Sequence, residues 1–363
     1  MNNRTLVVAT LLLLACVRSA ADDVERADLF VAGQGGYAAY RIPGVVSAAD
    51  GTVLAYCEAR KGGPSDWADI DVLARRSTDG GRTWGPPTVL VTKPADAKQN
   101  PAGPKRAAGA VTVNNPVAVA DGARGVVHFL YCVEYDRCFY RRSGDAGKTF
   151  ADPVEITAAF EKFRPEYDWK VIATGPGHGV KLRSGRLVVP VWLSTSTKGP
   201  HRPSCVATIY SDDDGKTWRR GDVVPTPGLV NPSETAVVEV GGKVMLNIRH
   251  EGEPHRRAVV EGRDGAGGWG QVRFDDALPE PVCMASLLQL GQDSLLFCNP
   301  NNPSGRERKN LTVKRSDDVG RTWKDVVTLE PGPSAYSDLA QAGGEVLCLY
   351  ERRGTLTLAR FRP

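Results

Sequence analysis

Three arginines stand where predicted strands begin or end, and together they could hold one carboxylate. Arg41 and Arg308 each precede a short apolar run, and Arg249 closes another such run at 244–248. A guanidinium donates paired hydrogen bonds to a carboxylate, so three that converged on one point would grip it from several sides. A lone arginine is usually a surface residue, and sequence spacing by itself does not bring these three together.

A second group of residues carries side chains that can transfer protons or attack a carbon atom. Asp66 lies in a polar loop ahead of a predicted strand, which suits an acid that protonates a leaving oxygen and then activates water. Glu234 stands beside a proline turn at the start of another strand, and Tyr336 lies in the segment 334–339. Each residue also has an ordinary interpretation, respectively a turn former, a rim charge and a packed aromatic.

The elements that must position these residues are organised by a repeated turn. The pattern S-x-D-x-G-x-T-W occurs at 77–84, 211–218 and 316–323, with Phe150 replacing the tryptophan at 143–150 and a worn copy at 262–269 that keeps only Asp264 and Trp269. Aspartate and glycine favour a tight turn, and the aromatic residue anchors it. Because short apolar runs flank the copies, each is predicted to be a hairpin turn in a small antiparallel sheet.

The spacing of these turns predicts the whole architecture. The copies recur about 50 to 70 residues apart, which is typical of a repeat fold. About 340 residues follow the N-terminal leader, and six repeats of about 57 residues would account for them. The predicted fold is therefore all-β: a six-bladed β-propeller of four-stranded antiparallel sheets, forming a single domain at 22–363. One short helix is predicted at 158–166.

Taken together, the ordered motifs resemble those of the sialidase (neuraminidase) family with Asp-box, or BNR, repeats, in its bacterial exo-α-sialidase form. The repeated turn resembles the Asp-box, and residues 40–44 resemble the Arg-Ile-Pro motif. The resemblance implies that Arg41, Arg249 and Arg308 clamp a substrate carboxylate. Arg308 is assigned by its place before the last Asp-box, and Arg306 is the competing candidate.

The same resemblance implies roles for the remaining candidates, which are listed here: Asp66 as general acid/base, Tyr336 as nucleophile, Glu234 as its proton acceptor, Glu351 as the residue that orients Arg41, and Arg60 as a further pocket arginine. Trp67 and Met284 are candidate walls for the acyl group of the sugar, with ordinary core or rim residues as the alternative interpretation. A phenol suits the nucleophile because, unlike a carboxylate, it is not repelled by the substrate's own carboxylate. The segment 174–179 resembles a glycine-rich loop of the family and receives no catalytic role.

The implied activity is that of an exo-α-sialidase, which hydrolyses terminal sialic acids with retention through a tyrosyl-enzyme intermediate. The alternatives are a trans-sialidase or a glycosidase that acts on a related acidic sugar, and a non-catalytic sialic-acid-binding propeller. The expected partners are sialylated glycoproteins, glycolipids and oligosaccharides, and the chain is expected to be a monomer. The net charge of +4, without a basic stripe interleaved with aromatics, does not indicate nucleic-acid binding.

The first residues read as a targeting segment. A charged start, a short apolar core and small residues predict a signal peptide at 1–21 and a secreted or periplasmic protein. Alternatively, residues 13–16 resemble a lipobox, in which Cys16 would be lipidated and anchor the protein to the membrane. The other seven cysteines are predicted to be buried free thiols, with Cys132 and Cys138 as the nearest alternative pair. No metal or cofactor is expected.

Overall fold

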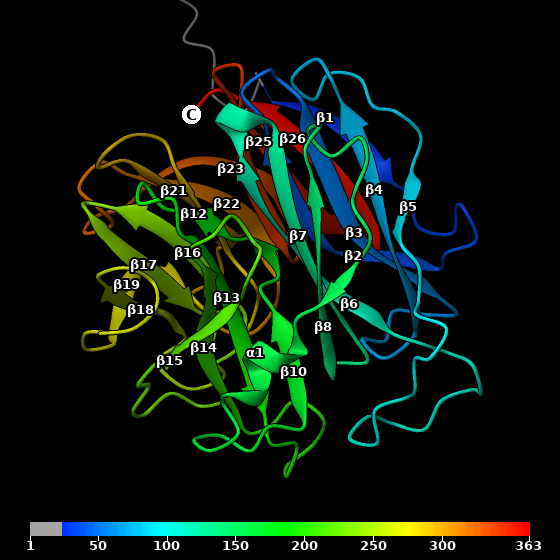
Figure 1. Ribbon diagram of the computed structural model, residues 1–363. Helices are drawn as coiled ribbons and strands as arrows, with labels where there is room; N and C mark the ends of the chain where they lie inside the picture. The colour runs from blue at the N-terminus through cyan, green and yellow to red at the C-terminus, as the bar shows by residue number, and fades with distance from the viewer. Residues whose placement is uncertain (1–23) are drawn as a thin grey trace, which may run out of the picture.

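The six small sheets of the structure are arranged as the blades of a propeller (Figure 1). The structure is a computed structural model that describes residues 24–363. The prediction of an all-β, six-bladed propeller is confirmed. The predicted signal peptide, with the alternative lipidation site at Cys16, lies outside the described residues.

Five of the sheets are built in chain order, beginning with the strand nearest the axis. Their members are β2 (Ala39–Ser47), β3 (Val53–Lys61), β4 (Asp69–Ser77) and β5 (Thr88–Val91); β6 (Val113–Asp121), β7 (Val126–Val133), β8 (Arg137–Ser143) and β9 (Val154–Glu155); β10 (Val171–Thr174), β12 (Val180–Lys181), β13 (Leu187–Ser194), β14 (Ser204–Ser211) and β15 (Arg219–Val223); β16 (Thr235–Val240), β17 (Lys243–Ile248), β18 (Arg256–Gly262) and β19 (Arg273–Pro279); and β20 (Ser286–Gln289), β21 (Leu295–Pro300), β22 (Lys309–Ser316) and β23 (Lys324–Pro333). The innermost strands of neighbouring sheets contact one another around a central cavity.

The sixth sheet closes the ring with strands from both ends of the described chain. It contains β24 (Ser337–Ala342), β25 (Glu345–Arg352) and β26 (Thr355–Phe361), and its outer strand is β1 (Glu25–Phe30). β1 pairs antiparallel with β26, and Thr357 donates a hydrogen bond of 2.6 Å to Asp28 across this pair. Apolar side chains of β1, β2 and β25 then pack in one core cluster, so the first and last parts of the chain share a core.

One innermost strand departs from the regular pattern. β10 and β12 both pair with β13, and between them β11 (Gly177–His178) crosses to pair in parallel with β6 of the neighbouring sheet. The crossing segment is the glycine-rich stretch at 174–179. Gly177 has a φ of +89°, and a Cβ atom there would lie 2.6 Å from the Met284 side chain. The glycines therefore allow the chain to pass between two blades, which is a structural role.

The four well-preserved repeats form the same hydrogen-bonded turn between the third and fourth strands of a sheet. In the first, Ser77 donates a hydrogen bond of 2.7 Å to Asp79, and the Thr83 hydroxyl donates one of 2.6 Å to the same carboxylate. The serine hydroxyl in turn accepts the backbone N–H of Gly81 at 2.9 Å. Equivalent bonds recur around Asp145, Asp213 and Asp318. These bonds explain why the sequence repeats its serine, aspartate and threonine together.

These turns predict a loss of stability in acid. Hydrogen bonds from threonine lower the pKa of Asp213 and Asp318 to about 2, below the value of about 3.9 for an unfolded aspartate. A depressed folded-state pKa stabilises the fold above about pH 4, and that contribution is lost as the pH falls toward 2. We expect the urea midpoint to fall between pH 5 and pH 3, and to fall less in the double variant D213N/D318N.

The control for this acid effect is Asp152→Asn, which changes an exposed aspartate outside the turns. That variant is expected to keep the wild-type pH dependence. An equal slope in the wild type and the double variant would contradict the assignment of acid sensitivity to the Asp-box turns.

The regions outside the blades agree with the sequence predictions in outline. The predicted helix is present but short, as α1 (Thr157–Glu161), and a single 3-10 turn, η1, covers Gly122–Arg124. The seven cysteines within 24–363 are buried free thiols, as predicted. Among these residues no helix is long and apolar enough to cross a membrane.

Candidate active site

The predicted site residues gather at the end of the ring opposite the Asp-box turns. Asp66 lies in the loop between the second and third strands of its sheet, whereas each Asp-box joins a third strand to a fourth. Because antiparallel strands alternate in direction, these two kinds of loop lie at opposite ends of the sheet. Glu234 and Tyr336 directly precede the innermost strands β16 and β24, at the same end as Asp66. The Asp-boxes therefore maintain the fold without contributing side chains to the site.

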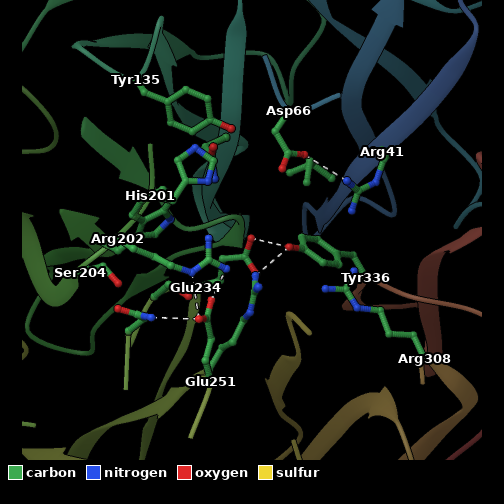
Figure 2. A pocket seen from close by; sticks show the side chains of 16 residues that line it. Arg41, Asp66, Tyr135, His201, Arg202, Ser204, Glu234, Glu251, Arg308 and Tyr336 are labelled. Carbon is green, nitrogen blue, oxygen red and sulfur yellow. Dashed lines mark hydrogen bonds and ion pairs between the residues drawn. The ribbon is translucent and has the colours of Figure 1, made fainter. Parts of the chain in front are cut away.

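A cavity of about 240 Å³ opens at this end of the ring. Its lining residues come from all six sheets and their loops: Arg41, Ile42, Asp66, Asn115, Tyr135, Trp192, His201, Arg202, Ser204, Asn231, Ser233, Glu234, Arg249, Glu251, Arg308 and Tyr336. Figure 2 shows Tyr336 and Glu234 side by side in this cavity, with Arg41 and Arg308 near the phenol ring. Six of the eight predicted catalytic, binding and orienting residues thus line a single pocket.

A tyrosine–glutamate pair lies at the centre of the pocket. The Tyr336 hydroxyl donates a hydrogen bond of 2.5 Å to Glu234 Oε1 and accepts one of 2.9 Å from Arg249 Nη1. Arg249 also forms an ion pair with the other Glu234 oxygen. Burial raises the pKa of Tyr336 well above its ordinary value. The side chain is therefore a neutral phenol at rest, with a carboxylate already in place to accept its proton.

Guanidinium groups surround this phenol. The Cζ atoms of Arg41 and Arg308 lie 5.1 and 5.4 Å from the centroid of the Tyr336 ring, and Arg249 contacts its hydroxyl. Arg308 is held by a hydrogen bond of 2.5 Å to the Val282 carbonyl oxygen. Three arginines that are far apart in sequence thus converge beside one side chain. This convergence concentrates positive charge that an incoming anion would neutralise.

Arg41 is held by two acidic residues. Its Nε atom lies 3.2 Å from Glu351 Oε1, and its Nη1 atom lies 3.1 Å from Asp66 Oδ1. Burial alone would lower the pKa of Arg41, but Glu351, Tyr336 and Asp66 together outweigh this effect and raise it. Glu351 also accepts the backbone N–H of Ile42 at 2.9 Å, and this hydrogen bond fixes the backbone next to Arg41. This is the geometry that an orienting role for Glu351 requires.

Asp66 lies at the mouth of the pocket, held by two arginines. Its Oδ1 atom accepts hydrogen bonds from Arg60 at 2.8 Å and from Arg41 at 3.1 Å. Burial would raise the pKa of Asp66, but these two guanidiniums outweigh that effect and lower it. The carboxyl is therefore ionised in the empty site at neutral pH. A ligand that drew Arg41 away would remove part of this stabilisation and favour protonation of Asp66.

Arg60 lies behind Asp66 and is not among the pocket-lining residues. Its guanidinium is wholly buried between Asp66 and Glu58, with Nη2 2.6 Å from Glu58 Oε2. Glu58 in turn accepts the backbone N–H of Asn115 at 2.8 Å. Arg60 therefore fixes the position of Asp66 and links it to the neighbouring blade, and a direct contact with a ligand in the cavity would need Asp66 to move.

The two candidate arginines before the last Asp-box lie in different surroundings. Arg308 lines the pocket, whereas Arg306 donates a hydrogen bond of 2.8 Å to the Glu251 carbonyl oxygen and is not among the lining residues. We expect Arg308→Ala to lower kcat/KM for a carboxylated substrate by about 10- to 100-fold, because charge-assisted hydrogen bonds are lost. Steady-state kinetics would measure this effect.

Arg306→Ala is the matched comparison, two residues away on the same segment. It is expected to change kcat/KM by less than about twofold, since within residues 24–363 its guanidinium hydrogen-bonds a backbone oxygen and no side chain. The opposite ranking of the two variants would transfer the binding role to Arg306.

The sequence interpretation missed the far wall of the pocket. Tyr135, Trp192, His201 and the pair Arg202–Glu251 line it, and Arg202 Nη2 lies 2.6 Å from Glu251 Oε1. Glu251 lies two residues after Arg249, and this proximity was the one available signal for it. The aromatic residues come from loops and strands without a distinctive motif.

The two residues considered as walls for an acyl group both lie behind the pocket surface. Trp67 is buried in an aromatic cluster with Tyr135 and Trp192, and Met284 packs against Ile42 and Tyr336. Neither is among the lining residues of the cavity. Each therefore supports a residue that lines the pocket.

The fold and the pocket define a class of protein: an Asp-box β-propeller whose central pocket sets a tyrosine–glutamate pair among clustered arginines. The family model described as a BNR repeat-like domain matches residues 51–348, and the chain belongs to this family. It is 32% identical to a sialidase of Bacteroides fragilis over 88% of its own length and 61% of that relative, and 30% identical to a sialidase of Micromonospora viridifaciens over 92% and 53%.

A solved structure is also similar to this chain over most of its length. The structure named Hadza microbial sialidase Hz136 superposes with a TM-score of 0.76 at 28% identity, over 93% of this chain and 68% of that one. Of the two curated relatives from Bacteroides fragilis and Micromonospora viridifaciens, the chain spans less than two thirds of the length.

Proposed function

We propose that the protein is an exo-α-sialidase that hydrolyses terminal sialic acids with retention of configuration. The observation that carries this proposal is the 2.5 Å contact between Tyr336 and Glu234, set among three guanidiniums in one pocket. The similarity to sialidases supports it. A sialic acid carries a carboxylate on its anomeric carbon, so a clamp for that group necessarily brings the reacting carbon close to the phenol.

Binding would begin with an exchange of partners at Arg41. In the empty site this arginine is paired with Asp66 and Glu351. The substrate carboxylate would take hydrogen bonds from Arg41, Arg249 and Arg308 and compete with Asp66 for the first of these. Glu351 would keep Arg41 oriented throughout. The exchange would favour the protonated form of Asp66 at the moment when an acid is needed.

The reaction would then proceed in two displacements. Asp66 protonates the glycosidic oxygen, and the Tyr336 oxygen bonds to the anomeric carbon as Glu234 takes the phenolic proton. The leaving alcohol departs and a glycosyl-tyrosine intermediate remains. Asp66, now ionised, removes a proton from a water molecule that attacks the anomeric carbon, and Tyr336 leaves and regains its proton from Glu234. Two inversions at the same carbon give net retention.

An activity assay on a fluorogenic aryl sialoside tests the proposal, with Asp66→Ala as the impaired control. Release of the fluorophore by the wild type is the expected result. No release across pH 4 to 8 would contradict the proposed function. Product analysis with sialyllactose and an added galactoside acceptor then separates hydrolysis from transfer to a sugar hydroxyl, the alternative activity of the same site.

The proposal also covers the substrates, the oligomeric state and the location of the protein. The proposed substrates are sialylated glycoproteins, glycolipids and oligosaccharides, bound by a monomer. We propose that residues 1–21 direct export, so that the protein is secreted or periplasmic, or held at a membrane if Cys16 is lipidated. Cell fractionation of the wild type and of Cys16→Ala would distinguish these locations.

A further inference from the structure

The loop that carries Asp66 needs support from outside the pocket. This loop, 62–68, joins β3 to β4, and Asp66 is its residue that lines the cavity. Because 46% of the Asp66 side chain is exposed, packing does not fix its carboxyl from every side. Arg41 and Arg60 hold that carboxyl in the empty site, but a substrate carboxylate would compete for Arg41. The position of the acid would then depend on the backbone of its own loop.

Two backbone carbonyl oxygens of this loop accept hydrogen bonds from a neighbouring segment. Thr112 Oγ1 donates one of 2.7 Å to the Ala68 oxygen, and Arg106 Nη1 donates one of 3.3 Å to the Trp67 oxygen. Arg106 also donates one of 2.9 Å to the Thr112 hydroxyl, and its Cζ atom lies 5.3 Å from the centroid of the Trp67 ring. Both donors belong to the long connection between β5 and β6, which Figure 1 shows as a cyan loop. The two carbonyls directly follow Asp66, so these bonds fix the backbone next to the acid.

Glu134 holds this connection in place. Its carboxylate forms an ion pair with Arg106 and accepts the backbone N–H groups of Thr112 at 2.7 Å and of Asn100 at 3.1 Å. The side chains of Glu134 and Arg106 are only 2% and 9% exposed. A buried carboxylate is costly unless it is paired and hydrogen-bonded, and this one meets both conditions. The connection is therefore fixed at three points by one side chain of the neighbouring sheet.

The backbone at Glu134 indicates that its side chain matters at this point. Glu134 and Tyr135 are the central residues of the turn between β7 and β8, and their φ values are +58° and +55°. Glycine or asparagine usually occupies such left-handed positions. Here both positions carry side chains with specific contacts, because Glu134 binds Arg106 and Tyr135 packs on Trp67 with ring centroids 4.6 Å apart. The turn thus reaches the Asp66 loop directly through Tyr135 and indirectly through Arg106.

We propose that Arg106, Thr112 and Glu134 are positioning residues, which hold the loop of Asp66 so that its carboxyl can deliver a proton to the leaving oxygen. This inference rests on the proposed function and explains how one of its steps is supported. None of the three residues lines the cavity, so they act through Asp66 and not on the substrate. A displacement of about 1 Å at a catalytic group can cost about 10²-fold in rate, which makes the effect of this cluster measurable.

The experiment compares two substrates that differ in their need for an acid. An aryl sialoside releases a stable phenolate, whereas sialyllactose releases a sugar alkoxide that depends on protonation as it departs. Thr112→Val removes the hydroxyl but keeps the shape, and Glu134→Gln removes the charge but keeps the size. Each is expected to lower kcat/KM for sialyllactose by about tenfold more than kcat/KM for the aryl sialoside. A merely structural role would lower both by the same factor.

Three further variants calibrate the ratio of the two kcat/KM values. Thr112→Ser restores a hydroxyl and should return the ratio toward that of the wild type. Thr208→Val is the matched control, because it deletes a buried hydroxyl that donates a hydrogen bond of 2.6 Å to the Gly265 carbonyl oxygen at the Asp-box end of the ring. It should leave the ratio unchanged. Asp66→Asn removes the acid itself and should change the ratio most.

Thermal melting would verify the fold of every variant. An equal fall for both substrates in Thr112→Val and Glu134→Gln, or no fall in either variant, would overturn the inference. Failure of the wild type to hydrolyse either substrate, or an unchanged ratio in Asp66→Asn, would instead contradict the proposed function. If one of the two cluster variants does not fold, the other decides the question.

Discussion

Tyr336→Phe is expected to lower kcat for an aryl sialoside by roughly 10³-fold or more while leaving the fold unchanged. Phenylalanine fills the same space but has no oxygen to bond to the anomeric carbon. Among the described residues, the hydroxyl that is removed hydrogen-bonds Glu234 and Arg249 alone, so the change leaves the hydrophobic contacts of the ring in place. Steady-state kinetics would measure the fall in kcat, and thermal melting would test that the fold is unchanged.

Tyr131→Phe provides the control for this prediction. Tyr131 is a buried tyrosine in the core between two blades, outside the cavity. Its variant should retain kcat within about twofold, because no pocket contact is lost. Near-wild-type turnover by Tyr336→Phe would rule out the phenol as nucleophile and would leave Glu234 as the next candidate for direct attack.

Glu280→Ala is expected to produce the largest loss of stability, about 3–5 kcal/mol in the free energy of unfolding. Glu280 forms an ion pair with Arg257, and both side chains are fully buried. Arg257 also donates hydrogen bonds of 2.9 Å to the carbonyl oxygens of Asn247 and Cys283. Removing the glutamate would leave a buried guanidinium without a counter-charge. Urea denaturation would measure the difference from the wild type.

The matched control for this ion pair is Glu261→Ala. Glu261 pairs with Lys243 at 2.8 Å on the surface, where 62% of the lysine side chain is exposed. An exposed pair of this kind contributes about 0–1 kcal/mol, so the variant should remain close to the wild type. Equal losses in the two variants would show that burial of the Arg257–Glu280 pair does not set its contribution.

The fold was predictable because its signal is local and repeated. A serine, an aspartate and a threonine that bond one another within a single turn leave the same residues at the same offsets in every copy, as around Asp79 and Asp318. The crossing of β11 to the neighbouring blade was not predictable from such a pattern. It depends on the packing of Gly177 against Met284, a contact between residues more than a hundred positions apart.

The candidate site was predictable only in part, because only some of its residues stand in local sequence motifs. Arg41 and Tyr336 stand in short motifs at strand starts, and the family resemblance supplied the placement that spacing could not. The aromatic wall has no such motif, because His201 and Tyr135 meet through loops of different sheets. The position of Arg60 behind Asp66 also depends on three-dimensional packing, since alternation along β3 does not decide which neighbour a buried guanidinium contacts.

The pairing of β1 with β26 bears on how the protein can be synthesised. The ribosome delivers β1 first, but its partner emerges only after almost all of the remaining described chain. Until then the nascent polypeptide has an unsealed ring and an unpaired strand edge, which is a template for association with other chains. A chaperone that shields this edge during translation would therefore raise the yield of folded protein more than one that acts after release.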